Sequence, residues 1–388
     1  MNVMLGADAI RYPLTGIGRY AYELGARLPG VAGVGEVRYF RAGRARPDLP
    51  GRPANGSGAG AGQAGMRRLA GAVPVLVEAF RQVAGLVQAR ALRPFRDYVF
   101  HGPNFYLPRH EGPCVATFHD LSAFLWSECH PAARIAYMHK QLPLALARAD
   151  VLITDSEFTR QEVAAHCAWP LERIAVAPLA AGPAYRPMAP HQAESALARL
   201  GLRFGAYALF VGTLDPRKNI DLLLDLYRDL PPALRLAVPL VVAGFEGWKS
   251  ERTIARLRDG EREGWARYLG FVDEDALPAL YAGARVFLYP SRYEGFGLPV
   301  LEAMAAGVPV ICSDAASLPE VTGAGAAAVL LDCDDRPAFR DALLRALEDD
   351  AWCAHAGRCG VERARHFSWD KTVSATLAAY RLAGRLAR

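Results

Sequence analysis

The stretch from Tyr289 to Val310 constrains the fold more than any other part of the chain. It begins with the last residue of an apolar run, Val286–Tyr289, which is typical of a buried parallel strand. A Pro-Ser break and a Gly-Phe-Gly loop follow, and from Pro299 the apolar residues recur at helical spacing. A loop between a parallel strand and a helix lies where doubly wound sheets bind their ligands. The stretch therefore predicts an α/β fold with a site in this loop.

Two carboxylates and a series of backbone amides lie within this stretch. Glu294 is in the loop, and Glu302 follows eight positions later, on the first turns of the helix. Gly295 and Gly297 are expected to let the backbone approach a ligand closely, because glycine lacks a Cβ atom. The amides of Gly297–Val300 point out of a helix N-terminus, where phosphate binds favourably. Together these groups fit a sugar joined to a nucleoside diphosphate.

Strands and helices alternate along both halves of the chain. With 388 residues, the chain is too long for one compact core and predicts two domains. Strands interleaved with helices predict parallel sheets, and Ala180–Pro190 is the best linker candidate. We therefore predict an α/β protein of two Rossmann-like, doubly wound domains, 1–184 and 185–366, facing an interdomain cleft. Strands are expected near 2–8, 37–40, 97–100, 115–118, 151–154 and 174–178, and near 207–212, 240–244, 268–272, 286–289 and 329–331.

Two loops of the first half are open to more than one interpretation. Thr15–Tyr20 follow the first predicted strand and contain G-x-G without the full dinucleotide fingerprint, so a simple tight turn is an alternative to a phosphate site. His119 follows another predicted strand at the end where ligands bind. Taken alone, such a histidine is more often a satisfied core residue. The residues alone leave both alternatives open.

Several motifs resemble one enzyme family. E-G-F-G-L-P-V-L-E at Glu294–Glu302 resembles the E-x7-E motif of the retaining glycosyltransferases of family 4, also called glycosyl transferases group 1. A-G-V-P-V-I after the helix and S-L-P-E-V at Ser317–Val321 match as well, and G-T-L-D-P-R-K-N at Gly212–Asn219 resembles the diphosphate loop. H-G-P-N-F-Y-L-P and T-F-H-D-L resemble acceptor-side loops of members that use GDP-mannose or GDP-deoxyhexoses. The resemblance implies the GT-B architecture, with a C-terminal helix, here 367–388, packed back on the first domain.

The resemblance also implies a role for each matching residue. Arg217 and Lys218 would hold the donor diphosphate and stabilise it as it leaves, helped by the amide of Gly16. Glu302 would bind the ribose hydroxyls, and Glu294 would bind a hydroxyl of the sugar. The implied catalytic residues are His119, Arg217, Lys218 and Glu294. The implied donor-binding residues are Gly16, Gly212, Arg217, Lys218, Phe271, Val272, Glu294, Phe296, Gly297, Leu298 and Glu302, and those on the acceptor side are Asn104 and Asp120.

The remaining implied roles concern the donor sugar, the base and the acceptor. In the family the position of His119 meets the donor sugar, and Asp120 is a candidate to orient that histidine or the acceptor hydroxyl. Phe271-Val272 would border the nucleobase. The implied activity is retaining transfer of mannose or D-rhamnose from a GDP-sugar to a hydroxyl of a lipid-linked glycan, such as a polyprenyl-pyrophosphate-linked one, in bacterial O-antigen biosynthesis. The family is thought to use front-face attack, with the leaving phosphate taking the acceptor proton.

We expect neither a cofactor nor a metal ion. No D-x-D element lies in the motif loops, and Asp332-Cys333-Asp334 is expected to be far from them. Arg217 and Lys218 would take the place of a metal at the diphosphate. No residue is indicated as a second carboxylate across the sugar from Glu294, as a glycosidase-like mechanism would need.

Positive charge is concentrated in one segment. The chain has a net charge of +5, and between Arg38 and Arg109 there are 12 Arg and 3 acidic residues. Residues 41–65 are predicted to be a flexible excursion, and Met66–Arg96 has helical apolar spacing with arginines around it. This segment is either a surface that contacts an anionic membrane or a lipid-linked acceptor, or simply a solvated helix face. Aromatic residues are nearly absent from 41–96, which disfavours nucleic-acid binding.

The sequence also bears on the cellular location of the protein and on alternative functions. The seven cysteines are scattered without a C-x-x-C pair, the N-terminus does not resemble a signal peptide, and no apolar run is long enough to span a membrane. We expect a cytoplasmic protein, in peripheral contact with the inner face of the membrane if the basic segment binds there. The alternatives are a UDP-sugar-dependent transferase of the same fold, a non-hydrolysing nucleotide-sugar epimerase, which would lack E-x7-E, and a catalytically silent binding protein.

Overall fold

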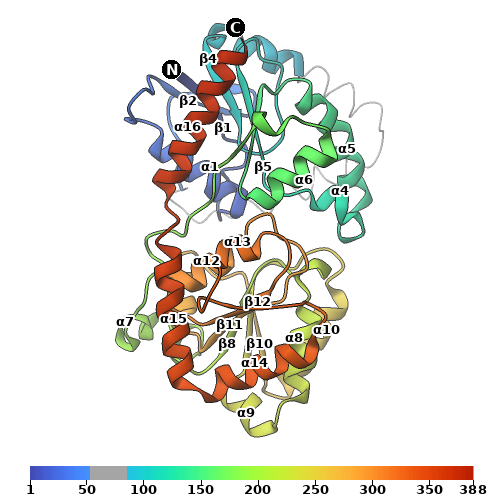
Figure 1. The fold of residues 1–388 in the computed structure, drawn as a ribbon, viewed down its shortest axis with the longest axis vertical. Coiled ribbons are helices and arrows are strands. Elements are labelled where there is room, and N and C mark those ends of the chain that lie inside the picture. Colours follow the sequence, from blue (N-terminus) through green and yellow to red (C-terminus); the bar gives the residue numbers. More distant parts are fainter. Residues whose placement is uncertain (53–84, 388) are drawn as a thin grey trace.

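The computed structural model describes residues 1–52 and 85–387 and contains two α/β units, one above the other (Figure 1). The sheet of the first unit has the order β3-β2-β1-β4-β5-β6-β7, and all neighbouring strands are parallel except β2 and β3. Its strands are β1 Asn2–Gly6, β2 Val37–Arg41, β3 Arg44–Arg46, β4 Tyr98–Gly102, β5 Cys114–Phe118, β6 Val151–Thr154 and β7 Ile174–Val176.

The sheet of the second unit is parallel throughout, in the order β10-β9-β8-β11-β12-β13. Its strands are β8 Ala208–Val211, β9 Leu240–Ala243, β10 Ala266–Gly270, β11 Val286–Tyr289, β12 Val310–Ser313 and β13 Val329–Leu331. The central strands are short apolar runs that are buried along their whole length, as expected for parallel strands covered by helices on both faces. The predicted α/β class with two doubly wound units is confirmed.

Helices cover the faces of both sheets (Figure 1). In the first unit they are α1 Gly16–Arg27, α4 Ser122–Leu125, α5 Ala132–Leu146 and α6 Glu157–Cys167. In the second unit they are α7 Pro190–Arg199, α8 Ile220–Asp229, α9 Pro232–Ala237, α10 Glu251–Arg262, α11 Leu277–Ala282, α12 Leu298–Ala305, α13 Leu318–Thr322, α14 Arg336–Glu348 and α15 Asp350–Ala364.

The last helix, α16 (Trp369–Leu386), returns to the first unit. It packs on β4, β5, β6 and β7, so that both chain termini lie at the far end of that unit (Figure 1). Tyr380 of α16 hydrogen-bonds to Nδ1 of His101 at 2.7 Å, and Nε2 of His101 lies 2.8 Å from the Thr117 hydroxyl. Burial lowers the pKa of His101 to about 3. His101 is therefore a neutral core residue that anchors the returning helix.

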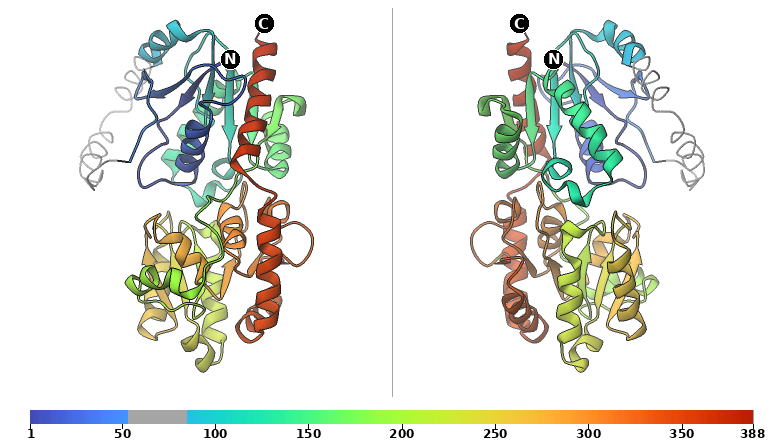
Figure 2. Two further views of the ribbon diagram at one scale, coloured as in Figure 1. Left: turned by 90° about the vertical axis from the view of Figure 1, so that its left-hand side faces the viewer. Right: turned by 90° about the vertical axis from the view of Figure 1, so that its right-hand side faces the viewer.

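The two units meet at the carboxyl ends of their sheets, through a narrow waist (Figure 2). The loop after β11 touches the loop after β5, and a Cβ atom at Gly295 would lie 1.7 Å from the carbonyl oxygen of His119. The Gly295 carbonyl accepts hydrogen bonds from Ser156 and Thr159 of the other unit, at 2.7 and 3.0 Å. Gly295 is thus required by contact between the units, whereas the sequence suggested contact with a ligand.

Three local predictions differ from the structure or lie partly outside it. Residues 41–65 were expected to be an irregular excursion, but Arg44–Arg46 pair with β2 as an antiparallel edge strand. Strand β10 ends at Gly270, whose φ of 62° interrupts the strand, so Phe271 and Val272 follow the strand instead of belonging to it. Residues 85–92 are helical, while most of the amphipathic stretch predicted at 66–96 lies outside the described residues. Within 1–52 and 85–387, no helix combines the length and apolarity that a membrane span requires.

Candidate active site

The loop between β11 and α12 carries the first half of the E-x7-E motif. Gly297 caps α12 with a φ of 102°, a conformation that favours glycine, and an added Cβ would lie 2.5 Å from the Leu318 side chain. Pro299 then occupies the first turn, where its missing N–H is harmless. This tight turn places Glu294 in the loop, and Glu302 on the buried face of the helix.

Glu294 forms a buried ion pair with Lys218. The Lys218 Nζ contacts Glu294 Oε1 and donates a hydrogen bond to the Tyr289 hydroxyl at 3.0 Å. Both residues are 7% exposed. Burial alone would raise the pKa of Glu294, but the charges of Lys218 and Arg217 lower it overall, so the carboxylate is ionised. The structure therefore joins two residues that lie 76 positions apart.

Arg217 connects the two units. Its Nη1 donates to the Tyr293 carbonyl at 3.2 Å and lies 3.5 Å from Asp120 Oδ2 of the first unit. Its Nε is 3.7 Å from Asp215 Oδ1. Burial would lower the pKa of Arg217, but Glu294, Asp120 and Asp215 raise it, which keeps the guanidinium charged. Arg217 and Lys218 thus form a buried cationic pair whose charge is balanced by carboxylates.

His119 is oriented by Asp155, whereas the resemblance offered Asp120 as a candidate to orient that histidine or the acceptor hydroxyl. Its Nδ1 lies 2.6 Å from Asp155 Oδ2, and its Nε2 lies 2.8 Å from the Pro103 carbonyl. Because a carbonyl only accepts, Nε2 carries a proton, and Nδ1 shares another with Asp155. Burial would lower the pKa of His119, but Asp155 and the Pro103 carbonyl raise it. With both nitrogens occupied, the ring has no free acceptor for a proton.

Asp120 has a different set of partners. Its Oδ1 accepts hydrogen bonds from the backbone N–H and the hydroxyl of Ser122, at 2.9 and 2.7 Å. Burial would raise its pKa, but the charge of Arg217 and the bonds from Ser122 lower it. Asp120 is therefore an ionised partner of Arg217. It brings the first unit's acceptor-side loop next to the diphosphate loop of the second unit.

Glu302 lies in a second buried cluster. Its carboxyl lies near the hydroxyls of Tyr281 and Tyr185, and it also interacts with the charge of Arg19 from α1 of the first unit. Arg19 Nη2 in turn lies 3.3 Å from Glu274 Oε1. Burial raises the pKa of Glu302 to about 7, and the Arg19 charge and the hydroxyls offset only part of this shift. Of the two carboxyl groups of the E-x7-E motif, that of Glu302 is the one whose charge changes near neutral pH.

The other predicted donor-binding residues occupy different environments. Gly16 begins α1, and a Cβ there would meet nothing within 4 Å, so no packing contact of the described residues demands a glycine. Gly212 follows β8 next to the Phe210 ring. Leu298 is half-buried at the start of α12, and Phe296 is 5% exposed with its ring against Phe367.

Phe271 and Val272 lie farther from the ion pair. They follow β10, which is separated from β11 by β9 and β8, or about 14 Å at the usual strand spacing. Phe271 is 37% exposed and stacks on Phe245 with ring centroids 4.7 Å apart, while Val272 is buried. Asn104, on the acceptor side, is half-buried directly after Pro103, the partner of His119. The structure thus groups His119, Asp120, Arg217, Lys218 and Glu294, with Phe271 at a distance.

Sequence reasoning missed a set of residues that hold the two units together. The Tyr293 hydroxyl donates to Glu162 at 2.6 Å and accepts from the Leu121 N–H at 3.0 Å. Ser156 caps α6 by accepting from the Thr159 N–H, and the hydroxyls of Ser156 and Thr159 also donate to the Gly295 carbonyl. The position of Asp155 at the carboxyl end of β6 was a usable signal, but its partner could not be read from a linear pattern.

The S-L-P-E-V flank at Ser317–Val321 also helps to hold the two units together. Glu320 of α13 accepts hydrogen bonds from the backbone N–H groups of Glu157 and Phe158, at 2.8 and 2.5 Å. These groups are at the N-terminus of α6 in the other unit, where a carboxylate is favourable. This flank therefore contributes to the junction between the units.

One group in the described part of the chain could hold a metal ion: Asp332, Cys333 and Asp334. This group is nearer to the motif loop than the sequence suggested, because Asp334 forms an ion pair with Arg292 at 2.6 Å, and Asn219 donates to the Cys333 carbonyl at 3.3 Å. Arg292 already balances one of the two carboxylates. The group borders the loop of Glu294 without taking part in the ion pairs of Arg217 and Lys218.

Solved structures of known proteins have the same fold. Sucrose-phosphate synthase from Thermosynechococcus elongatus superimposes with a TM-score of 0.69 at 22% identity, and the match covers 98% of each chain. WaaG, described as a glycosyltransferase involved in lipopolysaccharide biosynthesis, gives a TM-score of 0.67 at 15% identity over 99% of this chain and 100% of that one. At such identities the similarity concerns the fold, which is GT-B.

Sequence comparison is more specific. Residues 205–363 match the family model of the glycosyl transferases group 1. The serotype-specific mannosyltransferase WbdA of Escherichia coli is 31% identical over 267 residues, which are 66% of this chain and 32% of that protein. The O-antigen chain mannosyltransferase B of Escherichia coli is 41% identical over 387 residues, covering 98% of this chain and 100% of the relative. The chain therefore belongs to the glycosyl transferases group 1 and is a glycosyltransferase with the GT-B fold.

Proposed function

We propose that this chain transfers a mannosyl residue from GDP-mannose to a hydroxyl of a lipid-linked glycan in O-antigen assembly, with retention of anomeric configuration. The observation that carries the proposal is the 41% identity, over nearly the whole of both chains, with a protein named O-antigen chain mannosyltransferase B. GDP-D-rhamnose is the second donor to test, because the loops around Asn104 and His119 resemble those of enzymes that use GDP-deoxyhexoses as well as GDP-mannose.

The buried cationic pair supports the chemistry of this proposal. The difficult step is cleavage of the bond between the sugar and the diphosphate, during which negative charge accumulates on the leaving group. Arg217 and Lys218 lie together at the carboxyl end of the sheet and would stabilise that charge. Arg217 and Lys218 follow β8, and Phe271 follows β10, two strands or about 10 Å away, a separation that a nucleoside would bridge in this proposal.

Donor binding would exchange the partners of these charges. Without a donor, Glu294 neutralises Lys218, and Asp120 and Asp215 neutralise Arg217. In our proposal the diphosphate takes over the cations, which releases Glu294 to accept a hydrogen bond from a hydroxyl of the sugar. The acceptor oxygen then attacks C1 on the face from which the diphosphate leaves, and the diphosphate takes the acceptor proton. No metal ion or cofactor is required in this proposal.

A donor screen tests the proposal. Purified protein is incubated with GDP-mannose, GDP-D-rhamnose and UDP-glucose, each with a synthetic acceptor in which a sugar is linked to an alkyl diphosphate, and nucleoside diphosphate release is measured with and without a chelator. We expect release from GDP-mannose that the chelator does not change, and an NMR spectrum of the product that shows retained configuration. Preference for the UDP donor would overturn the guanine assignment, and an inverted product would overturn retention.

Contact of the basic segment with an anionic membrane stays a proposal, because residues 53–84 are outside the described part.

A further inference from the structure

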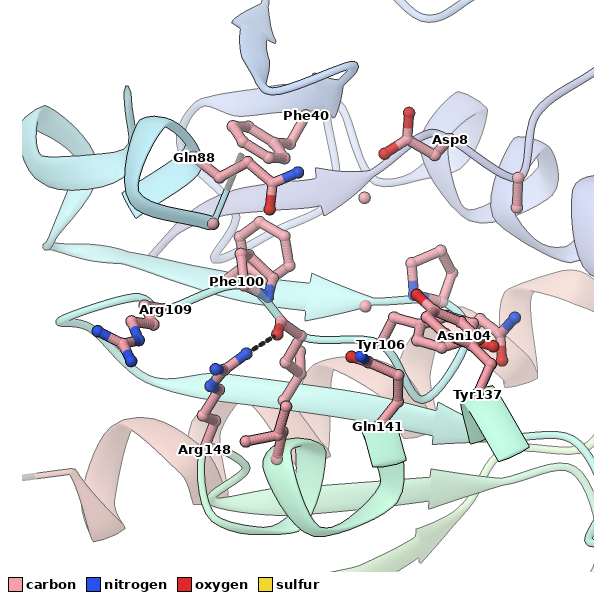
Figure 3. Close-up of a pocket in the computed structure, with 18 of the residues that line it drawn as sticks. Asp8, Phe40, Gln88, Phe100, Asn104, Tyr106, Arg109, Tyr137, Gln141 and Arg148 are labelled. Atoms are coloured by element: carbon pink, nitrogen blue, oxygen red, sulfur yellow. Dashed lines mark hydrogen bonds between the residues drawn. The ribbon is translucent and has the colours of Figure 1, made fainter. Parts of the chain in front are cut away.

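A cavity of about 1050 Å³ lies within the first unit, beside β1 and β4 (Figure 3). Its floor is formed by the sheet, with Phe40 and Phe100 (Figure 3). One wall is α5, and the other comes from residues 85, 86 and 88. The loop 102–109 after β4 runs along it. This volume is in the range of small-molecule sites, and the site residues described above, apart from Asn104, do not line it.

One end of the cavity adjoins the active site. Asn104 and Tyr106 lie at this end with Tyr137 of α5, and the rings of Tyr106 and Tyr137 are tilted by 35° with centroids 5.6 Å apart. Figure 3 shows these three side chains together. The Asn104 Oδ1 accepts from the Phe105 N–H at 2.9 Å, so its NH2 group points its donors elsewhere. Aromatic faces and amide donors suit a sugar ring, which has apolar faces and hydroxyl edges.

The other end is cationic. Arg109 and Arg148 lie near each other there (Figure 3), and Arg148 Nη1 donates to the Leu107 carbonyl at 2.5 Å. Neither arginine forms an ion pair with a carboxylate of the described residues. Burial, and to a smaller extent the neighbouring charge of Arg109, lower the pKa of Arg148. Among the described residues that line the cavity, Arg11, Arg109, Lys140 and Arg148 are cationic, and Asp8 is the carboxylate.

The two ends are separated by the length of β4. Asn104 lies two positions beyond Gly102, the last residue of that strand. At the other end, Nε2 of His110, the neighbour of Arg109, lies 2.9 Å from the carbonyl oxygen of the first residue, Tyr98. A five-residue strand spans roughly 13–16 Å. Leu86 and Leu144 line the cavity and are 61% and 40% exposed, so an apolar chain could continue outward from it.

We propose that this cavity binds the acceptor, with its terminal sugar at Asn104, Tyr106 and Tyr137 and a phosphate group at Arg109 and Arg148. The proposal rests on the proposed function and adds a requirement to it: the acceptor carries a phosphate about one strand length from the hydroxyl that is glycosylated. Two guanidinium groups match the geometry of phosphate oxygens, and the exposed leucines favour a phosphate linked to an apolar chain over the carboxylate of an acidic sugar.

Two synthetic acceptors with the same terminal sugar test the proposal, one a neutral alkyl glycoside and one with an alkyl diphosphate. We expect the wild-type protein to have at least a tenfold lower KM for the diphosphate acceptor. Arg148→Gln and Arg109→Gln should each remove about tenfold or more of this advantage, with the KM of the neutral acceptor and that of the donor unchanged. Arg258→Gln is the matched control, because Arg258 is an exposed arginine of α10, remote from the cavity. Equal losses on both acceptors, or no preference in the wild type, would refute the phosphate site.

Direct binding separates this proposal from the proposed function. Calorimetry with an alkyl diphosphate that has no sugar, in the presence of saturating GDP to fill the donor site, should show binding that both arginine variants weaken by about tenfold or more. This result is independent of whether mannose is transferred. Unchanged binding in both variants overturns the site. If the variants lose binding to vesicles with anionic lipids but keep binding of the soluble diphosphate, the ligand is a membrane headgroup and the acceptor assignment is wrong.

Discussion

Glu302→Gln should stabilise the protein while it weakens donor binding. Glu302 is 6% exposed, and burial raises the pKa of its carboxyl from the ordinary value of 4.5 to about 7. Glutamine has the same shape, and it keeps an oxygen for the hydroxyls of Tyr185 and Tyr281, but it carries no charge to desolvate. The substitution therefore removes an unfavourable buried charge without changing the shape of the side chain.

The sign and size follow from the pKa. The folded state binds the proton of Glu302 more tightly than the unfolded state, so the carboxyl contributes most to stability below about pH 4.5. That contribution is lost as the pH rises through about 7. A difference of about 2.5 pH units corresponds to at most about 3 kcal/mol. The pKa of about 7 already includes the attraction to Arg19, but burial of the glutamine amide reduces the gain. We therefore expect about 1–2 kcal/mol at pH 8, or a Tm increase of about 2–8 °C, and little change at pH 5.

Thermal unfolding of the ligand-free protein at pH 5 and pH 8 measures this effect, with Glu348→Gln, an exposed glutamate at the end of α14, as the matched control. Titration with GDP or the donor measures the second effect. If the ionised Glu302 binds the ribose, loss of charged hydrogen bonds should weaken donor binding by about 10- to 100-fold. A variant that is less stable at pH 8, or equally stabilised at both pH values, would refute the burial argument.

Three further predictions concern the cations and the junction between the units. Arg217→Ala should lower kcat by about 10²–10³-fold with a folded protein by circular dichroism, and Arg217→Lys should recover part of it; an unchanged kcat would contradict the leaving-group role. Gly295→Ala should lower turnover at least tenfold, because its Cβ would lie 1.7 Å from the His119 carbonyl oxygen, whereas Gly384→Ala, with nothing within 4 Å, should remain active. Tyr293→Phe should lower the free energy of unfolding in urea by about 1–3 kcal/mol, because Glu162 and the Leu121 N–H both lose the Tyr293 hydroxyl as a hydrogen-bond partner. A decrease of less than about 0.5 kcal/mol would argue against this role of Tyr293.

The alternation of strands and helices and the position of the motif loop could be predicted because they depend on local patterns. An apolar run such as Val286–Tyr289 can be buried on both faces only in a sheet covered by helices, and Gly297 and Pro299 set the turn that follows. Boundaries were less certain where a single residue decides them, as at Gly270, whose positive φ ends β10 before Phe271. The roles assigned to Arg217, Lys218 and Glu294 came from resemblance, and the structure adds the contacts of Lys218 with Glu294 and of Arg217 with Asp120.

The sequence by itself therefore determined the class of fold, its two halves and the chemistry available in each loop, because periodicity, turn residues and side-chain type are properties of neighbouring positions. Only the tertiary structure decided which side chains meet. The pairing of His119 with Asp155, the approach of Arg19 to Glu302, and the contact of Gly295 with the other unit all join residues from separate strands or separate units. Such contacts depend on how two sheets are placed in space, and neither spacing nor composition encodes that placement locally.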